Sequence, residues 1–213
     1  MEAMDRTQAG KALVNALAIG SEAPPPVVLA LAPGAVPIAY EVARAAHAEL
    51  DLLEVAPFYA PGTNLELGEV ASGGMRVLHA ERGRGLLDAD IAAAAAPVAD
   101  AIAAREHAWR RHHPRPDLAG VSVVLVADTV GADARMDAAV LLARVMGASR
   151  VVAAAPVALR KSLPQLRDDA DAVIYLDVVD DARALDLWYQ GEPPEDSALL
   201  GWLRRAEEWR ALA

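Results

Sequence analysis

Two short segments hold the residues that are best placed to bind a small ligand. Each segment follows an apolar run and precedes a helical pattern, and ligands of open parallel sheets bind at such strand-to-helix turns. Asp128 could hold a sugar hydroxyl or a metal ion, or could simply end a buried strand. Arg135 could bind an anion or face the solvent. The candidate ligand-binding residues are Pro33, Gly34, Ala35, Asp128, Thr129, Gly131, Ala132, Asp133, Ala134 and Arg135.

Asp133 stands directly before a helical pattern with an apolar stripe through Met136, Val140 and Ala143. Aspartate is among the best N-cap residues, so we expect it to cap a helix that begins near Ala134. Its carboxylate should accept a hydrogen bond from a backbone N–H two or three residues on.

The sequence excludes or lacks the residues of several common catalytic and metal sites. The chain has no cysteine, which excludes disulfides, thiolate metal sites and a cysteine nucleophile. It also lacks a Ser-His-Asp arrangement, a P-loop lysine and a dinucleotide glycine motif. His112 and His113 adjoin Arg110, Arg111 and Arg115, but adjacent side chains diverge and no third ligand is evident. We interpret this stretch as a solvated basic turn and assign no metal ligand.

The elements that must position the two segments alternate along the chain. Short runs that are apolar on both faces predict strands of a parallel sheet covered by helices on both sides. These runs are 27–31, 52–55, 121–126, 150–155 and 172–176. Helical patterns cover 5–19, with Asp5 as cap, and 36–48, 135–147 up to Gly147, 159–168 and 196–212. The fold class is therefore α/β, with a doubly wound, mainly parallel sheet.

One region interrupts the alternation. Around Ser72-Gly73-Gly74, apolar and polar residues alternate on both sides, which predicts an antiparallel hairpin. A long helix follows over 87–111, with a kink or break expected near 96 because of Pro97. We expect a single domain over 1–213, in which residues 57–111 form a hairpin plus long-helix insertion, or hood.

Composition narrows the classes of partner. The net charge of −10 repels nucleic acid and anionic membrane surfaces. The sequence shows neither a secretory signal nor an apolar run of the ~20 residues that a membrane span needs. We therefore expect a cytoplasmic protein with no nucleic-acid or membrane partner.

Several segments together resemble the type I phosphoribosyltransferases. Residues 123–140, VVLVADTVGADARMDAAV, match the frame of that family's sugar-phosphate loop, and 27–43, VVLALAPGAVPIAYEVA, resemble its pyrophosphate loop. Residues 60–74 are similar to the hairpin region of one bacterial branch, which 151–158 and 186–190 also fit. The resemblance spans nearly the whole chain and implies that family's fold.

The resemblance also implies a site chemistry. In the family, adjacent carboxylates bind the ribose hydroxyls, and a loop with Thr and Gly presents N–H groups to the 5′-phosphate at a helix N-terminus. A magnesium ion bridges the pyrophosphate and the sugar of phosphoribosyl pyrophosphate (PRPP).

This sequence departs from that pattern in both loops. Ala127 replaces the first acid and leaves Asp128 alone, Ala132 and Asp133 take the Thr and Gly positions, and Arg135 takes the next hydroxyl position. Two negative charges about 4 Å apart repel by about 4 kcal/mol at an effective dielectric near 20, so Asp133 should disfavour a phosphate. In the pyrophosphate loop, Pro33 stands where the branch has arginine and Ala35 where it has glycine. After the second strand, Ala56 and Pro57 stand where the branch has a basic pair.

Three functions follow from this comparison. The first is a phosphoribosyltransferase-like protein with an eroded PRPP site, non-catalytic or ligand-binding, whose ligand could be a phosphorylated sugar or nucleotide. The second is an active phosphoribosyltransferase with an altered site, the only case that calls for magnesium as cofactor. The third is a structural or interaction subunit, and a homodimer is compatible with each. Trp188 and Tyr189 could stack on a base, whereas Trp202 and Trp209 fit packing or a dimer contact.

Overall fold

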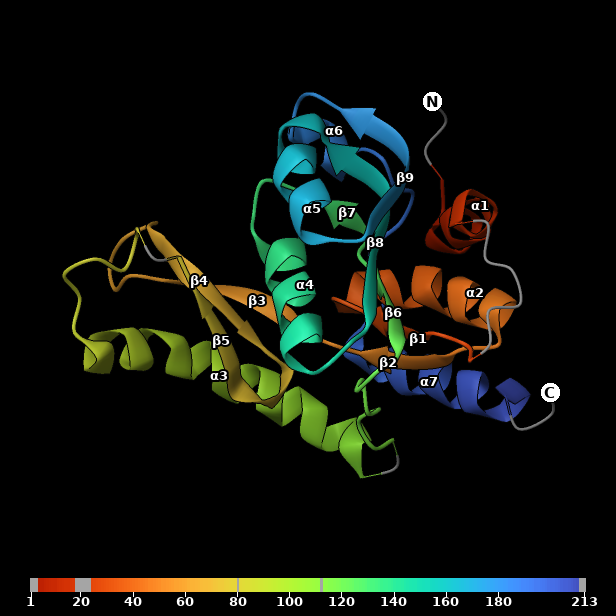
Figure 1. Cartoon of the computed structure of the whole chain (residues 1–213), viewed down its shortest axis with the longest axis horizontal. Helices are drawn as coiled ribbons and strands as arrows, with labels where there is room; N and C mark the ends of the chain where they lie inside the picture. Colours follow the sequence, from red (N-terminus) through yellow and green to blue (C-terminus); the bar gives the residue numbers. More distant parts are fainter. Residues whose placement is uncertain (1–3, 18–23, 80, 112, 211–213) are drawn as a thin grey trace.

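The computed structural model describes residues 4–17, 24–79, 81–111 and 113–210 (Figure 1). Six strands form a parallel sheet in which β2, β1, β6 and β8 lie side by side in that order. β6 pairs with the first half of β8 and the short β7 with its second half, while β9 pairs with β8 along most of its length. The strands are β1 Val27–Ala30, β2 Glu49–Leu52, β6 Ser122–Val126, β7 Thr129–Val130, β8 Arg150–Leu159 and β9 Ala172–Val179. This arrangement confirms the predicted α/β class with a doubly wound parallel sheet.

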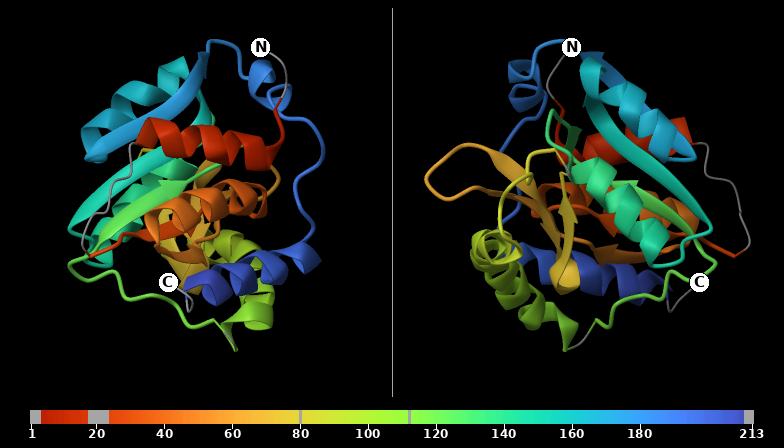
Figure 2. Two further views of the ribbon diagram at one scale, coloured as in Figure 1. Left: turned by 90° about the vertical axis from the view of Figure 1, so that its right-hand side faces the viewer. Right: turned by 60° about the vertical axis from the view of Figure 1, so that its left-hand side comes forward.

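Helices cover both faces of this sheet (Figure 2). One aliphatic cluster joins alternate strand residues such as Leu29, Leu125 and Ala153 to the helices α4 and α5. The opposite cluster joins Val28 and Val124 to α1, α2 and α7. Strand residues that pack on both faces produce the uninterrupted apolar runs of the sequence. The helices are α1 Arg6–Leu17, α2 Val36–Ala46, α4 Arg135–Val145, α5 Leu163–Asp169, α6 Arg183–Asp186 and α7 Asp196–Arg210.

The predicted hairpin is present and belongs to a second, antiparallel sheet. Strands β4 Glu66–Ala71 and β5 Met75–Leu78 meet at a turn in which Gly73 and Gly74 have positive φ. β3 Val55–Tyr59 pairs with the outer edge of β4, and α3 Asp88–Arg110 packs on this sheet through a small core that includes Phe58 and Ile91. β3 was not predicted, because its apolar residues look like the end of the preceding run.

Several predicted boundaries need correction. The run 52–55 is not a strand but the junction between β2 and β3, where the chain leaves one sheet for the other. β8 and β9 continue several residues beyond the predicted ends. α3 passes through Pro97 as one continuous helix, which excludes the break but not the kink that the sequence also allowed. Residues 18–19, 112 and 211–212 of the predicted elements lie outside the described part of the chain.

Two helix ends follow the expected capping chemistry. The Gln8 N–H donates to Asp5 Oδ1 at 2.7 Å, and the Asp5 N–H donates to Gln8 Oε1 at 3.3 Å, so the two residues cap α1 reciprocally. After α4, Gly147 adopts φ of 90°, which lets the Ala148 N–H reach the Ala143 carbonyl at 3.0 Å. Both predicted capping residues are confirmed, although α4 itself ends at Val145.

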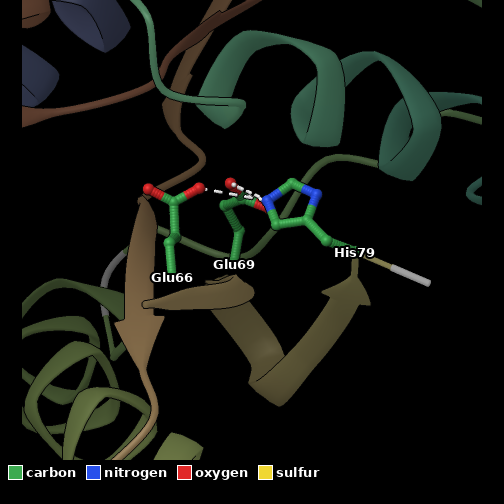
Figure 3. Close-up of side chains that lie close together, drawn as sticks. All are labelled: Glu66, Glu69 and His79. Carbon is green, nitrogen blue, oxygen red and sulfur yellow. Dashed lines mark hydrogen bonds and ion pairs between the residues drawn. The ribbon is translucent and has the colours of Figure 1, made fainter. Parts of the chain in front are cut away.

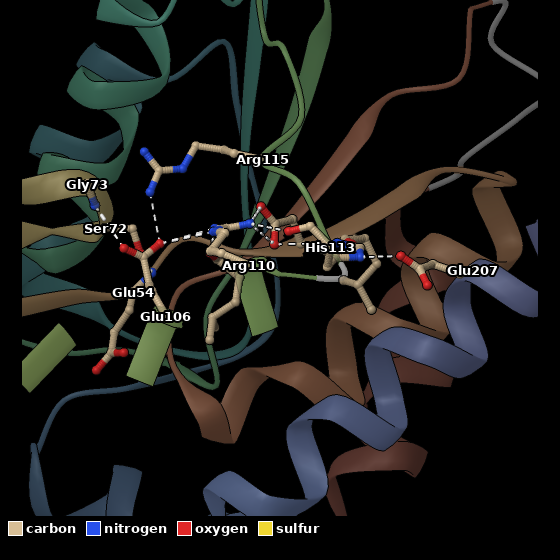
Figure 4. Close-up of polar contacts among 11 residues, drawn as sticks. Glu54, Ser72, Gly73, Glu106, Arg110, His113, Arg115 and Glu207 are labelled. Atoms are coloured by element: carbon tan, nitrogen blue, oxygen red, sulfur yellow. Dashed lines mark hydrogen bonds and ion pairs between the residues drawn. The ribbon is translucent and has the colours of Figure 1, made fainter. Parts of the chain in front are cut away.

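The basic stretch at the end of α3 is solvated only in part, which corrects the sequence interpretation for Arg110 and His113 (Figure 4). Arg110 donates to both carboxylate oxygens of Asp51, at 2.9 and 2.8 Å, and Asp51 is 1% exposed. Arg110 and Arg115 also donate to Glu106, at 3.2 and 2.8 Å. Burial raises the pKa of Asp51, and Arg110 opposes that rise. This network ties α3 to β2 of the parallel sheet.

His113 extends the same network to the C-terminal helix. The side chain is buried, and its ring nitrogens lie 2.9 Å from the Leu50 carbonyl oxygen and 2.6 Å from Glu207 Oε1 on α7. The histidine therefore links β2 and α7 and is not a solvated residue. α7 in turn packs through Trp202, whose ring meets Tyr40 edge-on at 5.0 Å, as one of the two sequence interpretations expected.

Candidate functional site

The two candidate loops meet at the carboxyl edge of the parallel sheet, as predicted. Pro33–Ala35 form a short 3-10 turn between β1 and α2, and the 128–135 segment follows β6. A Cβ atom on Gly34 would stand 2.6 Å from Asp128 Oδ2. Glycine therefore permits the close approach of the two loops, as its lack of a side chain allows.

The second loop is held by hydrogen bonds to other parts of the chain. Asp128 Oδ1 accepts from the Thr129 N–H at 3.0 Å, and the Asp128 carbonyl accepts from the Tyr189 hydroxyl at 2.5 Å. Ser162 Oγ donates to the Gly131 carbonyl at 2.5 Å. In addition, β7 inserts the loop into the sheet beside β8, a feature too short to detect in the sequence. The loop is thus fixed by several partners.

Trp188 does not form a platform for a base. Its side chain is 8% exposed and packs with Val157 and Leu185, while its indole N–H donates to Asp177 Oδ2 at 3.3 Å. Burial raises the pKa of the Tyr189 hydroxyl, which is committed to the loop carbonyl. Tyr189 therefore holds the loop, and Trp188 packs beside it in the core.

Asp133 and Arg135 form a bidentate ion pair at the start of α4. Asp133 Oδ1 accepts from the Arg135 N–H at 3.3 Å, as predicted, although Ala134 and not Asp133 occupies the N-cap position. The Arg135 guanidinium adds two bonds to the same carboxylate, each 3.0 Å long. This bidentate pair raises the pKa of Arg135 and engages the cation that could otherwise meet an anion.

Little space remains inside this loop. The cavity there offers about 10 Å³, which corresponds to one water molecule. Five of the ten predicted site residues line it, all from the 128–135 segment, together with two residues that follow β1. The lining comprises Leu31, Ala32, Ala127, Asp128, Thr129, Val130, Gly131, Asp133, Arg135 and Met136.

A much larger cavity, of about 420 Å³, lies on the other side of α4 and was missed by the sequence analysis. It separates the β4–β5 hairpin from α4 and α5, and its volume falls in the range of ligand pockets. Its acidic residues are Glu69, Asp137 and Asp169, and Arg144 is its cation. The signal available in the sequence was a glutamate in the middle of an otherwise apolar hairpin strand.

A bulge in β4 places Glu66 and Glu69 on the same side of the hairpin. Tyr59 pairs with Glu66 and Phe58 pairs with Gly68, so Leu67 is an extra residue in the ladder. The alternation of faces shifts by one at such a bulge, which brings residues three apart to one face. Gly68 is required there, because a Cβ would stand 2.0 Å from the carbonyl oxygen of Val77.

His79, just past β5, completes a cluster with these two glutamates (Figure 3). Its Nε2 atom lies 3.0 Å from Glu66 Oε1 and 3.3 Å from Glu69 Oε1. The potential ligand atoms of all three residues lie within 4.8 Å of one another, an arrangement that could hold a metal ion. Burial raises the pKa of Glu69 to about 7.

Asp137, on the cavity side of α4, should make stability depend on pH. Burial and the nearby Asp169 carboxylate raise its pKa to about 6 from 3.8. Its stabilising contribution is therefore full below pH ~4 and is lost as pH rises through 6. We expect Asp137→Asn to raise the free energy of unfolding at pH 7.5 by about 1 kcal/mol, allowing for solvent screening.

Urea unfolding at about pH 4 and about pH 7.5 measures this effect. The gain over the wild type should vanish at the lower pH, where the wild-type carboxyl is mostly protonated. Asp168→Asn, at an exposed position on α5, is the matched control. An equal gain at both pH values would show that Asp137 does not titrate as described.

Comparison with known proteins supports the family resemblance. No family model matches the chain. The Mycobacterium tuberculosis H37Rv protein named "Putative phosphoribosyl transferase Rv0571c" is 34% identical over 176 residues, which are 81% of this chain, and its counterpart in strain CDC 1551 gives the same values. The match spans only 39% of the length of these relatives.

A solved structure agrees over nearly the full length. The crystal structure of the protein TT1426 from Thermus thermophilus is 36% identical, with a TM-score of 0.84, and the match covers 96% of this chain and 99% of that one. A purine phosphoribosyltransferase from Pyrococcus horikoshii matches at 16% identity with a TM-score of 0.47 over 89% of this chain and 93% of that one. Among the described residues, no helix combines the length and the apolar character that a membrane span needs. From its sequence motifs, its parallel sheet with the two loops at the carboxyl edge and its mycobacterial relatives, the chain belongs to the type I phosphoribosyltransferase family.

Proposed function

We propose that this domain keeps the phosphoribosyltransferase fold without phosphoribosyl transfer, and that it acts by binding a ligand. The observation that carries the proposal is the Asp133–Arg135 pair at the start of α4. In the family, a phosphate receives backbone N–H groups at this helix N-terminus. In this chain the Asp133 carboxylate takes that N–H, brings negative charge and engages the neighbouring guanidinium.

The residues present do not fit a magnesium–PRPP complex. Asp128 is the only carboxylate left of the family's acidic pair, and its Oδ1 already accepts from the Thr129 N–H. Its Oδ2 faces the backbone of Gly34, against which the other loop packs. The other carboxylate of this cavity, that of Asp133, is bound by Arg135, and a space of about 10 Å³ holds neither a ribose nor a hydrated divalent ion. No step of a transfer reaction is therefore assigned to these residues.

The larger cavity supports the ligand-binding part of the proposal. Its volume of about 420 Å³ suits a small molecule, and its wall combines the apolar Val77, Val140 and Leu141 with charged groups. Because the wall carries three acidic side chains, with Arg144 and His79 as its basic ones, the cavity favours a ligand with positive charge over a phosphorylated one.

Pyrophosphate release tests the proposal. The purified chain is incubated with PRPP, Mg²⁺ and a panel of nucleobases, with an active phosphoribosyltransferase as the positive control. We expect a rate far below about 1 s⁻¹, the low end of ordinary enzymes. Turnover at or above that rate would favour the alternative, an enzyme with an altered site built on Asp128 and Arg135. Absence of both turnover and small-molecule binding would favour an interaction subunit.

A further inference from the structure

We propose that Glu66, Glu69 and His79 form a binding site for a divalent transition-metal cation, with Zn²⁺ as the best fit. The site lies on the hairpin face of the large cavity, whose wall also includes Ala134 just before α4. The inference goes beyond the proposed function, because it holds or fails independently of PRPP binding.

The separations of the ligand atoms suit a metal ion. His79 Nε2 is 3.0 Å from Glu66 Oε1 and 3.3 Å from Glu69 Oε1. Two ligands on a tetrahedral zinc ion with bonds of about 2.0–2.1 Å stand about 3.3 Å apart. Imidazole and carboxylate together are a common donor set for zinc, whereas magnesium prefers oxygen ligands alone.

The burial of Glu69 is the independent observation that calls for a cation. Its side chain is 1% exposed, and the one ion-pair contact is that of Oε1 with His79 Nε2 at 3.3 Å. Oε2 is buried and has no hydrogen-bond partner among the described residues. A buried carboxylate is costly unless it is paired or coordinates a metal. The bulge at Leu67 turns this carboxylate toward Glu66 and His79, where a single cation would contact all three.

Arg82 is the competitor that the proposal must take into account. Its Nη1 lies 3.1 Å from Glu66 Oε1, and its side chain is 47% exposed. An exposed ion pair of this kind contributes little to stability, so a metal ion can displace it. Arg82 therefore weakens metal binding without preventing it.

The site also leaves one side open. Glu69 and His79 line the cavity of about 420 Å³, so a cation held by them faces that space. Three protein ligands with an open fourth position are the pattern of zinc sites that bind a further ligand or water. The cavity would thus give the metal access to a small molecule.

Calorimetric titration with ZnCl₂ tests the proposal on tag-free, chelator-stripped protein. We expect one Zn²⁺ per chain with micromolar or tighter affinity, and MgCl₂ should bind at least about tenfold more weakly. Glu69→Gln, which keeps the shape of the side chain, should weaken Zn²⁺ binding by about 100-fold. Glu81→Gln is the control, because Glu81 is an exposed acid two residues after His79 and pairs with Arg84 instead of with the cluster.

Arg82→Gln separates a metal site from a purely structural ion-pair cluster. Removing the competing guanidinium should tighten Zn²⁺ binding several-fold, a gain that cannot come from misfolding. The proposal is overturned if the wild type binds Zn²⁺ no better than Glu69→Gln does. It is also overturned if Arg82→Gln leaves the Zn²⁺ affinity unchanged while the control Glu81→Gln lowers it.

Discussion

Arg110→Met is expected to lower the free energy of unfolding by about 3–5 kcal/mol, the range found when a buried ion pair loses one partner. The guanidinium binds both oxygens of Asp51 at 2.9 and 2.8 Å and also donates to the Leu52 carbonyl at 3.2 Å. Methionine keeps much of the apolar stem, so the loss reflects the charge left on Asp51, which is 1% exposed.

Two variants separate this charge effect from packing. Asp51→Asn added to Arg110→Met should recover a large part of the loss, because no uncompensated carboxylate remains. Arg111→Met, at the exposed neighbouring position, should change stability by no more than about 0.5 kcal/mol. Chemical denaturation of the four proteins gives the comparison. A loss below about 1 kcal/mol in Arg110→Met, or no recovery in the double variant, would contradict the role given to this pair.

The sheet could be predicted because its strands are buried on both faces. Residues such as Leu29 and Val124 pack against helices on opposite sides, so each strand is apolar throughout. The cap by Asp5 and the backbone bond to Asp133 depend on residues two or three apart, and such local chemistry is legible in a sequence. Local signals therefore predicted the elements and the position of the candidate loops.

The buried polar residues could not be predicted in this way. Arg110 and Asp51 are 59 positions apart in the sequence, and only the fold shows that they meet. The stretch around Arg110 is polar, and polar residues are mostly exposed, so a solvated turn was the expected interpretation there. His113 was misread for the same reason, since its partners come from β2 and α7.

The hairpin cavity was missed because a bulge is invisible to simple alternation. With strict alternation, Glu66 and Glu69 would point to opposite faces of β4, and no cluster would be expected. The extra residue Leu67 changes this, and the sequence sign was Gly68, whose position admits no side chain. Five of the predicted site residues line the small cavity, whereas the larger cavity includes only Ala134 among them.

Opening the phosphate loop should create affinity that the wild type lacks. Asp133→Gly removes the charge that repels a phosphate and frees Arg135 to meet it, so affinity for ribose 5-phosphate should rise by about tenfold or more. Its effect on stability should be small, a few tenths of a kcal/mol for the cap and up to about 1 kcal/mol for the ion pair. Adding Ala127→Asp and Ala132→Thr should give about another tenfold through contacts to the sugar and phosphate.

Asp133→Asn is the matched control for this series. It keeps the shape and a hydrogen-bond acceptor for the Arg135 N–H, but it removes the negative charge. If charge is what closes the loop, this variant should gain part of the affinity of Asp133→Gly. If only space matters, it should behave like the wild type.

Calorimetric titration of the wild-type chain with ribose 5-phosphate is the most direct test of the central claim that this loop no longer accepts a sugar phosphate. The account predicts no saturable binding at millimolar ligand for the wild type and measurable binding for the triple variant. Tight binding by the wild type that is abolished by Arg135→Ala would contradict the account, and would show that Arg135 leaves Asp133 to bind the phosphate.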